Sequence, residues 1–498
     1  MSNMLARNAL SNVLQILLST MLLFLLYRYL SATLGIAKLG VWSVVLATAS
    51  ASRIADFGLS VGVTRFVAKY LSSAEPRRAA AAIETAALTL WVTFAIVLVA
   101  VYPLLSRIIA HVFESEHQLD ALSLLPYAML SLWFSIVVDV FQSGLDGCQR
   151  MDLRAGLVLA GQMLLFALAL LLVPQFGLIG LAWAQIGQGV SLLIIGWWLL
   201  RRRLPQLSRV PWHWQRDILR EMLGYGVNVQ IASFAMIIFD PLTKALMARF
   251  GGATAAGYFE IATQVVIKVR SIIVGANKAI VPMVVQYNEN LPQRIQKIYQ
   301  ENMQLLVLIT LPVYTFLFVW SSFVSQFLLG EYNTEFVFYC QLAVAAWALN
   351  TFSGPAYFFN LGTGRVGWNT LSHLTIGGLN VILGFLLGRR FGADGVALAY
   401  AGSLTVGSCL LIYLFQKINA VPIRVLALRE HLGLVSATLF SIVYASLDVM
   451  VPYSGKIIHM SLILLVPLLI IGVATWLHPM RKRLWTRLLD PAVAKAAK

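Results

Sequence analysis

Charged residues are scarce in this chain, and their scarcity excludes most classes of soluble protein. Only 12% of the 498 residues are charged, whereas 59% are hydrophobic, and the mean hydropathy is +0.79. A soluble domain carries about 25% charged residues. Apolar runs of about 20 residues recur along the chain, and this is the length that crosses a bilayer as a helix. We therefore expect an all-α, polytopic membrane protein.

Several functional signatures are also missing. The three cysteines, Cys148, Cys340 and Cys409, have no metal-ligand spacing, so we expect neither a disulfide nor a metal site. Neither GxxxxGK[ST] nor a strand-to-helix GxGxxG occurs, which argues against nucleotide hydrolysis. No loop between the apolar runs exceeds about 20 residues, too short for a catalytic domain. We expect no enzyme activity, no catalytic residue and no cofactor.

The net charge of +16 is explained by the orientation of the chain in the membrane, and it does not indicate a nucleic-acid partner. We expect about 14 spans and place the amino terminus inside, because most of the lysines and arginines then fall in inside loops. Both termini would then be cytoplasmic. The expected organisation is an N-terminal lobe (1–200), a basic cytoplasmic linker (201–220), a C-terminal lobe (221–416) and two extra helices with a basic tail (417–498). The predicted spans are 10–30, 39–62, 84–108, 121–144, 154–173, 177–200, 221–246, 255–285, 302–325, 335–360, 367–388, 392–416, 432–451 and 457–478.

The chain also contains an internal repeat. A shift of 217 residues places Gly40 on Gly257 and Arg53 on Arg270. A shift of 215 superimposes two copies of FGxxGxAxAxxG, which begin at Phe176 and Phe391. Each half has an even number of spans, so the two six-helix lobes are expected to be parallel repeats related by a pseudo-two-fold axis along the membrane normal. The small residues of the motif indicate close helix packing.

Ionisable residues at membrane depth are costly and mark candidate sites. The candidate substrate-binding cations are Arg53, Arg270, Lys268 and Lys278. Because Arg53 and Arg270 are repeat equivalents, both are expected to line one central cavity that suits a phosphate or diphosphate. The alternative is local neutralisation, for example an Arg53–Asp56 pair at i, i+3.

Acidic residues at membrane depth give the candidates for ion coupling: Asp56, Asp139 and Asp240. Asp240 precedes Pro241, where the helix is expected to bend or break. The alternative role for Asp240 is an ion pair with Lys244. Glu84 is expected in the first turn of its helix, where the helix dipole favours an acid.

The stretch Gly40-Val41-Trp42, followed by RIADFGLSVGVTRFVAKY, resembles the polysaccharide or oligosaccharide flippase family of the multidrug/oligosaccharidyl-lipid/polysaccharide exporter superfamily. The resemblance implies 12 to 14 spans, two lobes around a central cavity and alternating access. It further implies transfer of lipid-diphosphate-linked oligosaccharide across the bacterial inner membrane for surface polysaccharide assembly. The expected partners are this anionic substrate, membrane lipids and polysaccharide polymerase machinery, without nucleic acid.

Two related functions stay open. A multidrug or cation antiporter of the same superfamily would need acids for cationic drugs, yet the first span has none and most charges at membrane depth are positive. A lipid II-type flippase is chemically closer and also has two additional C-terminal spans.

Overall fold

A computed structural model describes residues 2–113, 115–277, 292–419, 421, 428–449 and 457–481. Every regular element in these ranges is a helix. Seven of the described helices are long and apolar enough to cross a membrane, or eight if one bent pair forms a single span. The predicted all-α, multi-span fold is confirmed.

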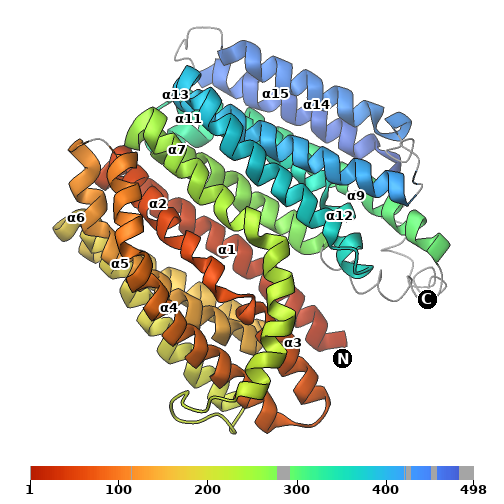
Figure 1. The fold of residues 1–498 in the computed structure, drawn as a ribbon. Coiled ribbons are helices and arrows are strands. Elements are labelled where there is room, and N and C mark those ends of the chain that lie inside the picture. Colours follow the sequence, from red (N-terminus) through yellow and green to blue (C-terminus); the bar gives the residue numbers. More distant parts are fainter. Residues whose placement is uncertain are drawn as a thin grey trace. The chain divides into compact units, whose positions relative to one another are not determined.

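The described chain separates into two compact units, and α7 and α13 contribute to both. The first comprises Met1–Ile261 and Gly377–Ala397, and the second comprises Ala262–Ile376 and Leu398–Lys498. Within the first unit, α5 packs along α4 and α6, and α1 packs along α6 (Figure 1). The elements of the first unit are α1 (Ser2–Leu34), α2 (Ile36–Ser50), η1 (Ala51–Asp56), α3 (Leu59–Ser72), α4 (Pro76–Val112), α5 (Ser115–Gly147), α6 (Met151–Arg203) and parts of α7 (Arg216–Asn277) and α13 (Gly367–Ile418).

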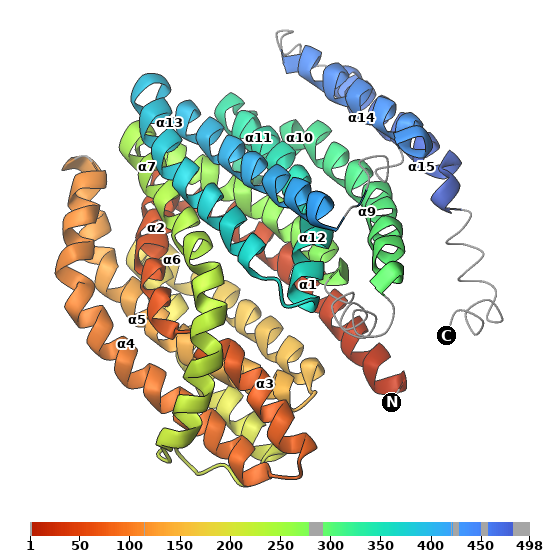
Figure 2. The same ribbon diagram turned by 45° about the vertical axis from the view of Figure 1, so that its right-hand side comes forward.

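The second unit completes α7 and α13 and adds a layer of further helices. In it, α9 packs against α11, α14 and α15, and the last two pack against each other (Figure 2). The additional elements are α9 (Pro292–Val319), α10 (Ser321–Leu329), α11 (Thr334–Phe352), α12 (Gly354–Gly362), α14 (Leu428–Val449) and α15 (Ile457–Leu477).

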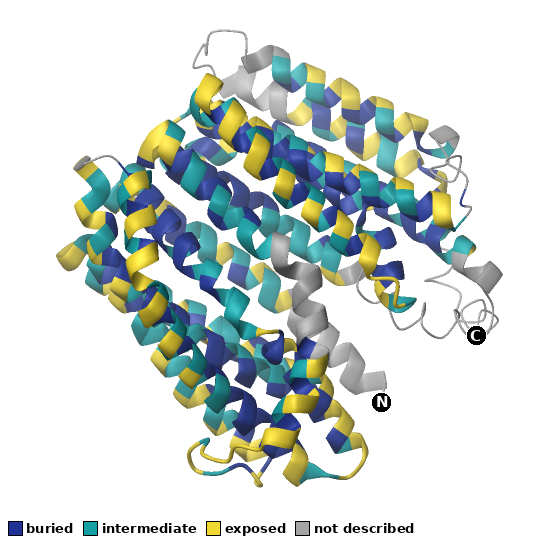
Figure 3. Cartoon of the chain, in the orientation of Figure 1, coloured by how far each residue is buried: buried dark blue, intermediate teal, exposed yellow. Residues whose placement is uncertain are grey.

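The surface of the helices is apolar where a soluble protein would be polar. On α4, Ile96 is 64% exposed and Val99 is 78% exposed, and Ile194 on α6 is 65% exposed. Figure 3 shows buried stripes alternating with exposed ones along these helices. Large exposed apolar surfaces of this kind mark contact with lipid or with another protein. For helices of this length, the simplest environment is the hydrocarbon core of a bilayer.

Both copies of the repeated glycine motif adopt the same local structure. Gly177 in α6 has φ 57° and ψ −131°, and its equivalent Gly392 in α13 has φ 62° and ψ −142°. Each glycine lies at the junction of two predicted spans, and its backbone conformation ends the first helix. Glycine takes such a conformation more readily than any other residue. Gly180 and Gly395 then pack so closely on the preceding helix that a Cβ would overlap the carbonyl oxygen of Leu172 or Leu387. The predicted close packing is therefore found within each hairpin.

The other repeated glycine pair lies where α2 crosses α7. A Cβ on Gly40 would overlap the carbonyl oxygen of Ala253, and a Cβ on Gly257 would overlap that of Ile36. The residues of each equivalent pair, Gly40 with Gly257 and Ile36 with Ala253, are 217 apart. The crossing is thus two-fold symmetric, with each glycine lying beside its own repeat equivalent.

Of the expectations about helix boundaries, a break at Pro241 and a first-turn position for Glu84 are wrong. The α7 helix continues across Pro241, and its non-helical residue is Gly252 (φ 78°, ψ 178°). Proline is accommodated inside membrane helices when neighbouring groups satisfy the freed carbonyl. Glu84 is not in a first turn, because α4 begins at Pro76.

Candidate functional site

Arg53 lies in a stretch of 3₁₀ helix that interrupts the second predicted span. The span bends by 45° between η1 and α3, at Phe57 (φ 49°) and Gly58 (φ 70°). Short 3₁₀ segments within membrane helices often occur at functional positions. Here the segment directs the Arg53 side chain towards α5 rather than along its own helix.

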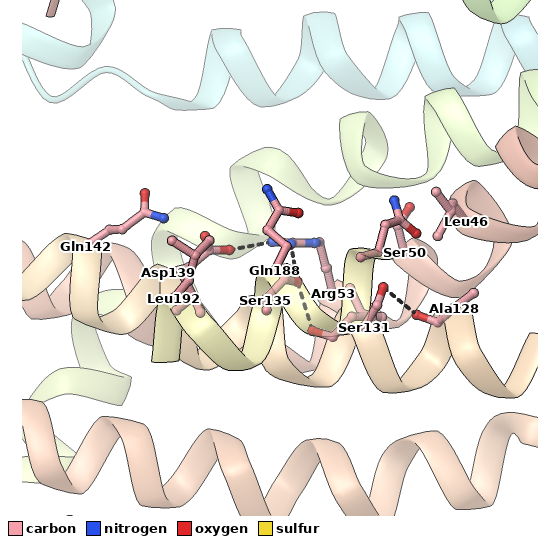
Figure 4. Close-up of a pocket in the computed structure, with 14 residues that line it drawn as sticks. Leu46, Ser50, Arg53, Ala128, Ser131, Ser135, Asp139, Gln142, Gln188 and Leu192 are labelled. Atoms are coloured by element: carbon pink, nitrogen blue, oxygen red, sulfur yellow. Dashed lines mark hydrogen bonds and ion pairs between the residues drawn. The ribbon is translucent and has the colours of Figure 1, made fainter. Parts of the chain in front are cut away.

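The partner of Arg53 is Asp139, not Asp56. Arg53 Nη1 donates to Asp139 Oδ2 at 2.8 Å and Nη2 donates to Ser135 Oγ at 2.9 Å (Figure 4). Asp56 instead accepts from the backbone N–H and hydroxyl of Ser60, at 3.2 and 3.0 Å. Arg53 and Asp139, two of the predicted site residues, therefore form one ion pair, whereas Asp56 binds the first turn of α3.

The Arg53–Asp139 pair belongs to a polar pocket of about 330 Å³. The pocket is lined by α2 and η1, by the face of α5 that carries Ser131, Ser135, Asp139 and Gln142, and by α6. Gln185 and Gln188 on α6 complete the polar lining. These serines and glutamines are not among the predicted site residues. For those on α5, the signal in the sequence is the spacing of i, i+4, i+8 and i+11 along one helix face, in which Asp139 is the i+8 residue.

Arg270 has a different environment in the second unit. Its Nη2 donates to Asn350 Oδ1 at 2.7 Å, and its guanidinium lies 4.5 Å from the ring centroid of Trp347. Asn350 donates in turn to Ser408 Oγ at 2.9 Å, and Trp347 Nε1 donates to the Tyr400 hydroxyl at 2.7 Å. Arg270 is therefore positioned by α11 and α13 through uncharged groups.

No described carboxylate forms an ion pair with Arg270 or with Lys268. The Arg270 Nε is buried and has no hydrogen-bond partner among the described atoms. Lys268 is half-buried on the same helix. Lys278 lies outside the described residues. Arg53 and Arg270 belong to different units, so their sharing of one cavity stays a prediction.

The two arginines differ in their suitability for an anion. A phosphate bound to Arg53 would also approach Asp139, and two like charges 4 Å apart repel by about 4 kcal/mol at an effective dielectric constant of 20. Arg270 has no such carboxylate among the described residues. Its uncompensated charge would be stabilised by an anion, because buried charges are normally paired. The geometry therefore favours the second unit for anion binding.

The third predicted acid, Asp240, belongs to a buried network in the first unit. Lys244 Nζ lies 2.8 Å from Asp240 Oδ2 and 2.7 Å from Glu260 Oε2. Glu260 also accepts from Tyr27 Oη and Ser43 Oγ, both at 2.7 Å. The Asp240–Lys244 pair is the alternative stated from the sequence, and Glu260 extends it to α1 and α2.

This network also follows the internal repeat. Tyr27 and Lys244 are 217 residues apart, as are Ser43 and Glu260. One copy therefore supplies neutral hydroxyls, and the other supplies the charged pair, at a place next to the Gly40–Gly257 crossing. The repeat offset is the sequence signal that could have identified Glu260.

Glu84 holds the loop that follows α6. Its carboxylate is 2% exposed and accepts from Ser208 N at 2.7 Å, Ser208 Oγ at 3.1 Å and His213 N at 3.1 Å. Trp214 Nε1 donates to Thr89 on the same helix at 3.1 Å. Part of the basic linker is thus bound to α4 by a buried acid.

Comparison with known proteins identifies the family of this chain. A model of the family described as polysaccharide biosynthesis protein matches residues 77–337, just over half of the 498 residues. The chain belongs to the polysaccharide biosynthesis protein family. No curated protein sequence matches this family member.

Solved structures share the fold of this family member at low sequence identity. The lipid II flippase MurJ in an inward closed conformation superimposes with a TM-score of 0.69 and 12% identity, over 97% of this chain and 99% of that one. An inward-facing multidrug resistance MATE transporter of the MOP superfamily gives 0.64 and 15%, over 80% and 94%. A MOP superfamily transporter from Pyrococcus furiosus Vc1 (DSM3638), whose binding pocket is described as having reverse polarity, gives 0.60 and 15%, over 84% and 95%. The fold is that of MOP superfamily transporters.

Proposed function

We propose that this protein is a flippase that moves lipid-diphosphate-linked oligosaccharide units from the inner to the outer leaflet of a bacterial inner membrane. The units would serve surface polysaccharide assembly. The observation that carries this proposal is Arg270, a cation in a predicted membrane span that has only uncharged partners among the described residues. Membership of the polysaccharide biosynthesis protein family supports the class of substrate.

The role of Arg270 in this proposal is to bind the diphosphate. Arginine presents a planar fork of N–H donors that matches phosphate oxygens, and charge-assisted hydrogen bonds of this kind are stronger than neutral ones. Asn350 and the Trp347 ring hold the guanidinium in one orientation. Lys268 on the same helix would add positive charge, and alternating access would carry the head group across the membrane.

Two alternatives of the same superfamily remain as competing proposals. A lipid II-type flippase would use the same diphosphate chemistry, and the lipid II flippase MurJ matches 97% of this chain. A multidrug or cation antiporter would need acids available for cations. The described acids Asp139 and Glu260 are each paired with a cation here, which disfavours an antiporter.

The test is to measure surface polysaccharide in cells that carry Arg270→Ala or Arg270→Lys at equal amounts of protein in the membrane. We expect Arg270→Ala to lower export about tenfold or more, because hydrogen bonds to a charged group contribute about 1.5–3 kcal/mol. Arg270→Lys keeps the charge without the fork and should be intermediate. The matched control is Arg390→Ala, which removes an exposed arginine.

Normal export by the Arg270→Ala variant would reject diphosphate binding at this residue. An equal loss in the Arg390→Ala control would show that the effect has no connection with membrane depth. Transport of cationic dyes by the purified protein, together with normal polysaccharide export by the Arg270→Ala variant, would favour the antiporter.

A further inference from the structure

The polar pocket of the first unit has a lining without net charge. Its charged lining residues are Arg53 and Asp139, which pair at 2.8 Å. A carboxylate beside the guanidinium disfavours an anion, and the guanidinium beside the carboxylate disfavours a cation. An apolar ligand would leave the hydrogen-bonding groups of this lining without partners. The pocket is therefore suited to a neutral, polar molecule.

Three glutamines make this pocket a hydrogen-bonding surface. Gln142 lies on α5, one turn from Asp139, and Gln185 and Gln188 lie one turn apart on α6. Among the described residues, the side chains of Gln142 and Gln188 have no hydrogen-bond partner, and the Gln185 side chain accepts only a long bond of 3.4 Å from Trp42 Nε1. An amide side chain offers two donor hydrogens and an acceptor oxygen. Gln142 and Gln188 thus present unused donors and acceptors beside the Arg53–Asp139 pair (Figure 4).

Sugar hydroxyl groups match this arrangement. Each hydroxyl both donates and accepts, so a ring with several hydroxyls can use amides, a carboxylate and a guanidinium together. A volume of about 330 Å³ lies at the small end of the range for ligand pockets, which is roughly 300–1,000 Å³. Such a volume suits a single sugar residue better than a whole oligosaccharide.

We propose that the pocket of Gln142, Gln185 and Gln188 around the Arg53–Asp139 pair binds an uncharged sugar residue of the transported molecule. This proposal rests on the proposed function for the identity of that molecule. It separates two tasks: the first unit recognises the sugar, and Arg270 in the second unit binds the diphosphate. Sugar specificity would then depend on α5 and α6, not on the cations.

The experiment uses the full chain, purified in lipid nanodiscs, and two kinds of probe. Methyl glycosides of glucose, galactose and mannose report on the pocket by saturation-transfer NMR, and inorganic pyrophosphate reports on the cations by calorimetry. The test variant is Gln142→Leu with Gln188→Leu, and Gln188→Asn keeps an amide. The matched control is Gln162→Leu, on α6 but outside the pocket.

We expect at least one methyl glycoside to bind the unaltered protein and to bind the double-leucine variant about tenfold more weakly, because two neutral hydrogen bonds are lost. Gln188→Asn should retain part of the binding, and Gln162→Leu should retain all of it. Pyrophosphate affinity should be unchanged in these variants and reduced in Arg270→Ala. If each variant elutes from a size-exclusion column at the same volume as the unaltered protein, misfolding is excluded as the cause of weaker binding.

Three results would overturn the sugar pocket. They are no binding of any glycoside, undiminished binding to the double-leucine variant, and a loss of pyrophosphate affinity that accompanies the glutamine changes. If the protein binds glycosides as expected but does not bind pyrophosphate, the proposed function fails and the pocket is supported.

Discussion

The buried network of Lys244 and Glu260 gives the sharpest prediction about stability. The Glu260 side chain is 5% exposed and the Lys244 side chain is 7% exposed, so neither charge is well hydrated. Replacing Glu260 by Gln removes the carboxylate and leaves the Lys244 ammonium with Asp240, which is 46% exposed. Removing one partner of a buried ion pair costs about 3–5 kcal/mol. We expect Glu260→Gln to lie at the lower end of that range, because Asp240 remains.

Lys244→Met should lower the free energy of unfolding by a similar amount, since the Glu260 carboxylate would keep only the hydrogen bonds from the Tyr27 and Ser43 hydroxyls. The double variant removes both charges, so its loss should be about 2 kcal/mol or more below the sum of the two single losses. The assay is a denaturant titration of the full chain in mixed micelles. Lys69→Met is the control, because Lys69 and Glu221 form an ion pair with 54% and 38% exposed side chains, worth at most about 1 kcal/mol.

Either of two results would contradict a stabilising Lys244–Glu260 pair. The first is that Glu260→Gln destabilises the protein no more than Lys69→Met does. The second is that the losses of stability in Lys244→Met and Glu260→Gln simply add in the double variant. Additivity would mean that the two charges do not stabilise each other in the folded protein.

Two further predictions concern the packing of α2 on α7 and the hydrogen bonds that hold the loop after α6. Gly40→Leu should prevent the close crossing of α2 and α7, because even a Cβ would overlap the Ala253 carbonyl oxygen, and the yield of folded protein should fall sharply by size-exclusion chromatography; Gly156→Leu, where no atom lies within 4 Å of the added Cβ, should leave the yield unchanged. Glu84→Ala should release the loop around Ser208 and His213 by removing a buried acceptor of several hydrogen bonds, so that trypsin cleaves at Arg209 faster than in the unaltered protein; an unchanged cleavage rate would show that Glu84 does not hold the loop.

Features encoded locally were predictable from the sequence. The apolar runs predict the helices, and the small residues of the two glycine motifs predict the close packing found in both copies. The Asp240–Lys244 pair was also accessible, because the two residues are four apart on one helix. In each case the interacting groups lie within one or two turns.

Contacts between distant helices were not predictable in this way. Arg53 could be tested only against neighbours on its own helix, and its partner Asp139 is 86 residues away on α5. The 3₁₀ geometry of η1, which directs Arg53 towards α5, leaves no clear pattern in the sequence. The expected break at Pro241 was wrong for a related reason, since whether a proline interrupts a membrane helix depends on its neighbours in space.

The symmetric crossing of α2 and α7 has a consequence for the residues that the two copies of the repeat can carry there. In a homodimer of two identical halves, a residue on the two-fold axis faces its own copy. Ser43 and Glu260 occupy such a position, with a hydrogen bond of 2.7 Å between them. Two glutamates there would repel each other, by about 4 kcal/mol at 4 Å and an effective dielectric constant of 20. The Ser43–Glu260 hydrogen bond thus needs two copies that differ at this position, as the two halves of this chain do, and the Lys244–Glu260 ion pair distinguishes one copy from the other.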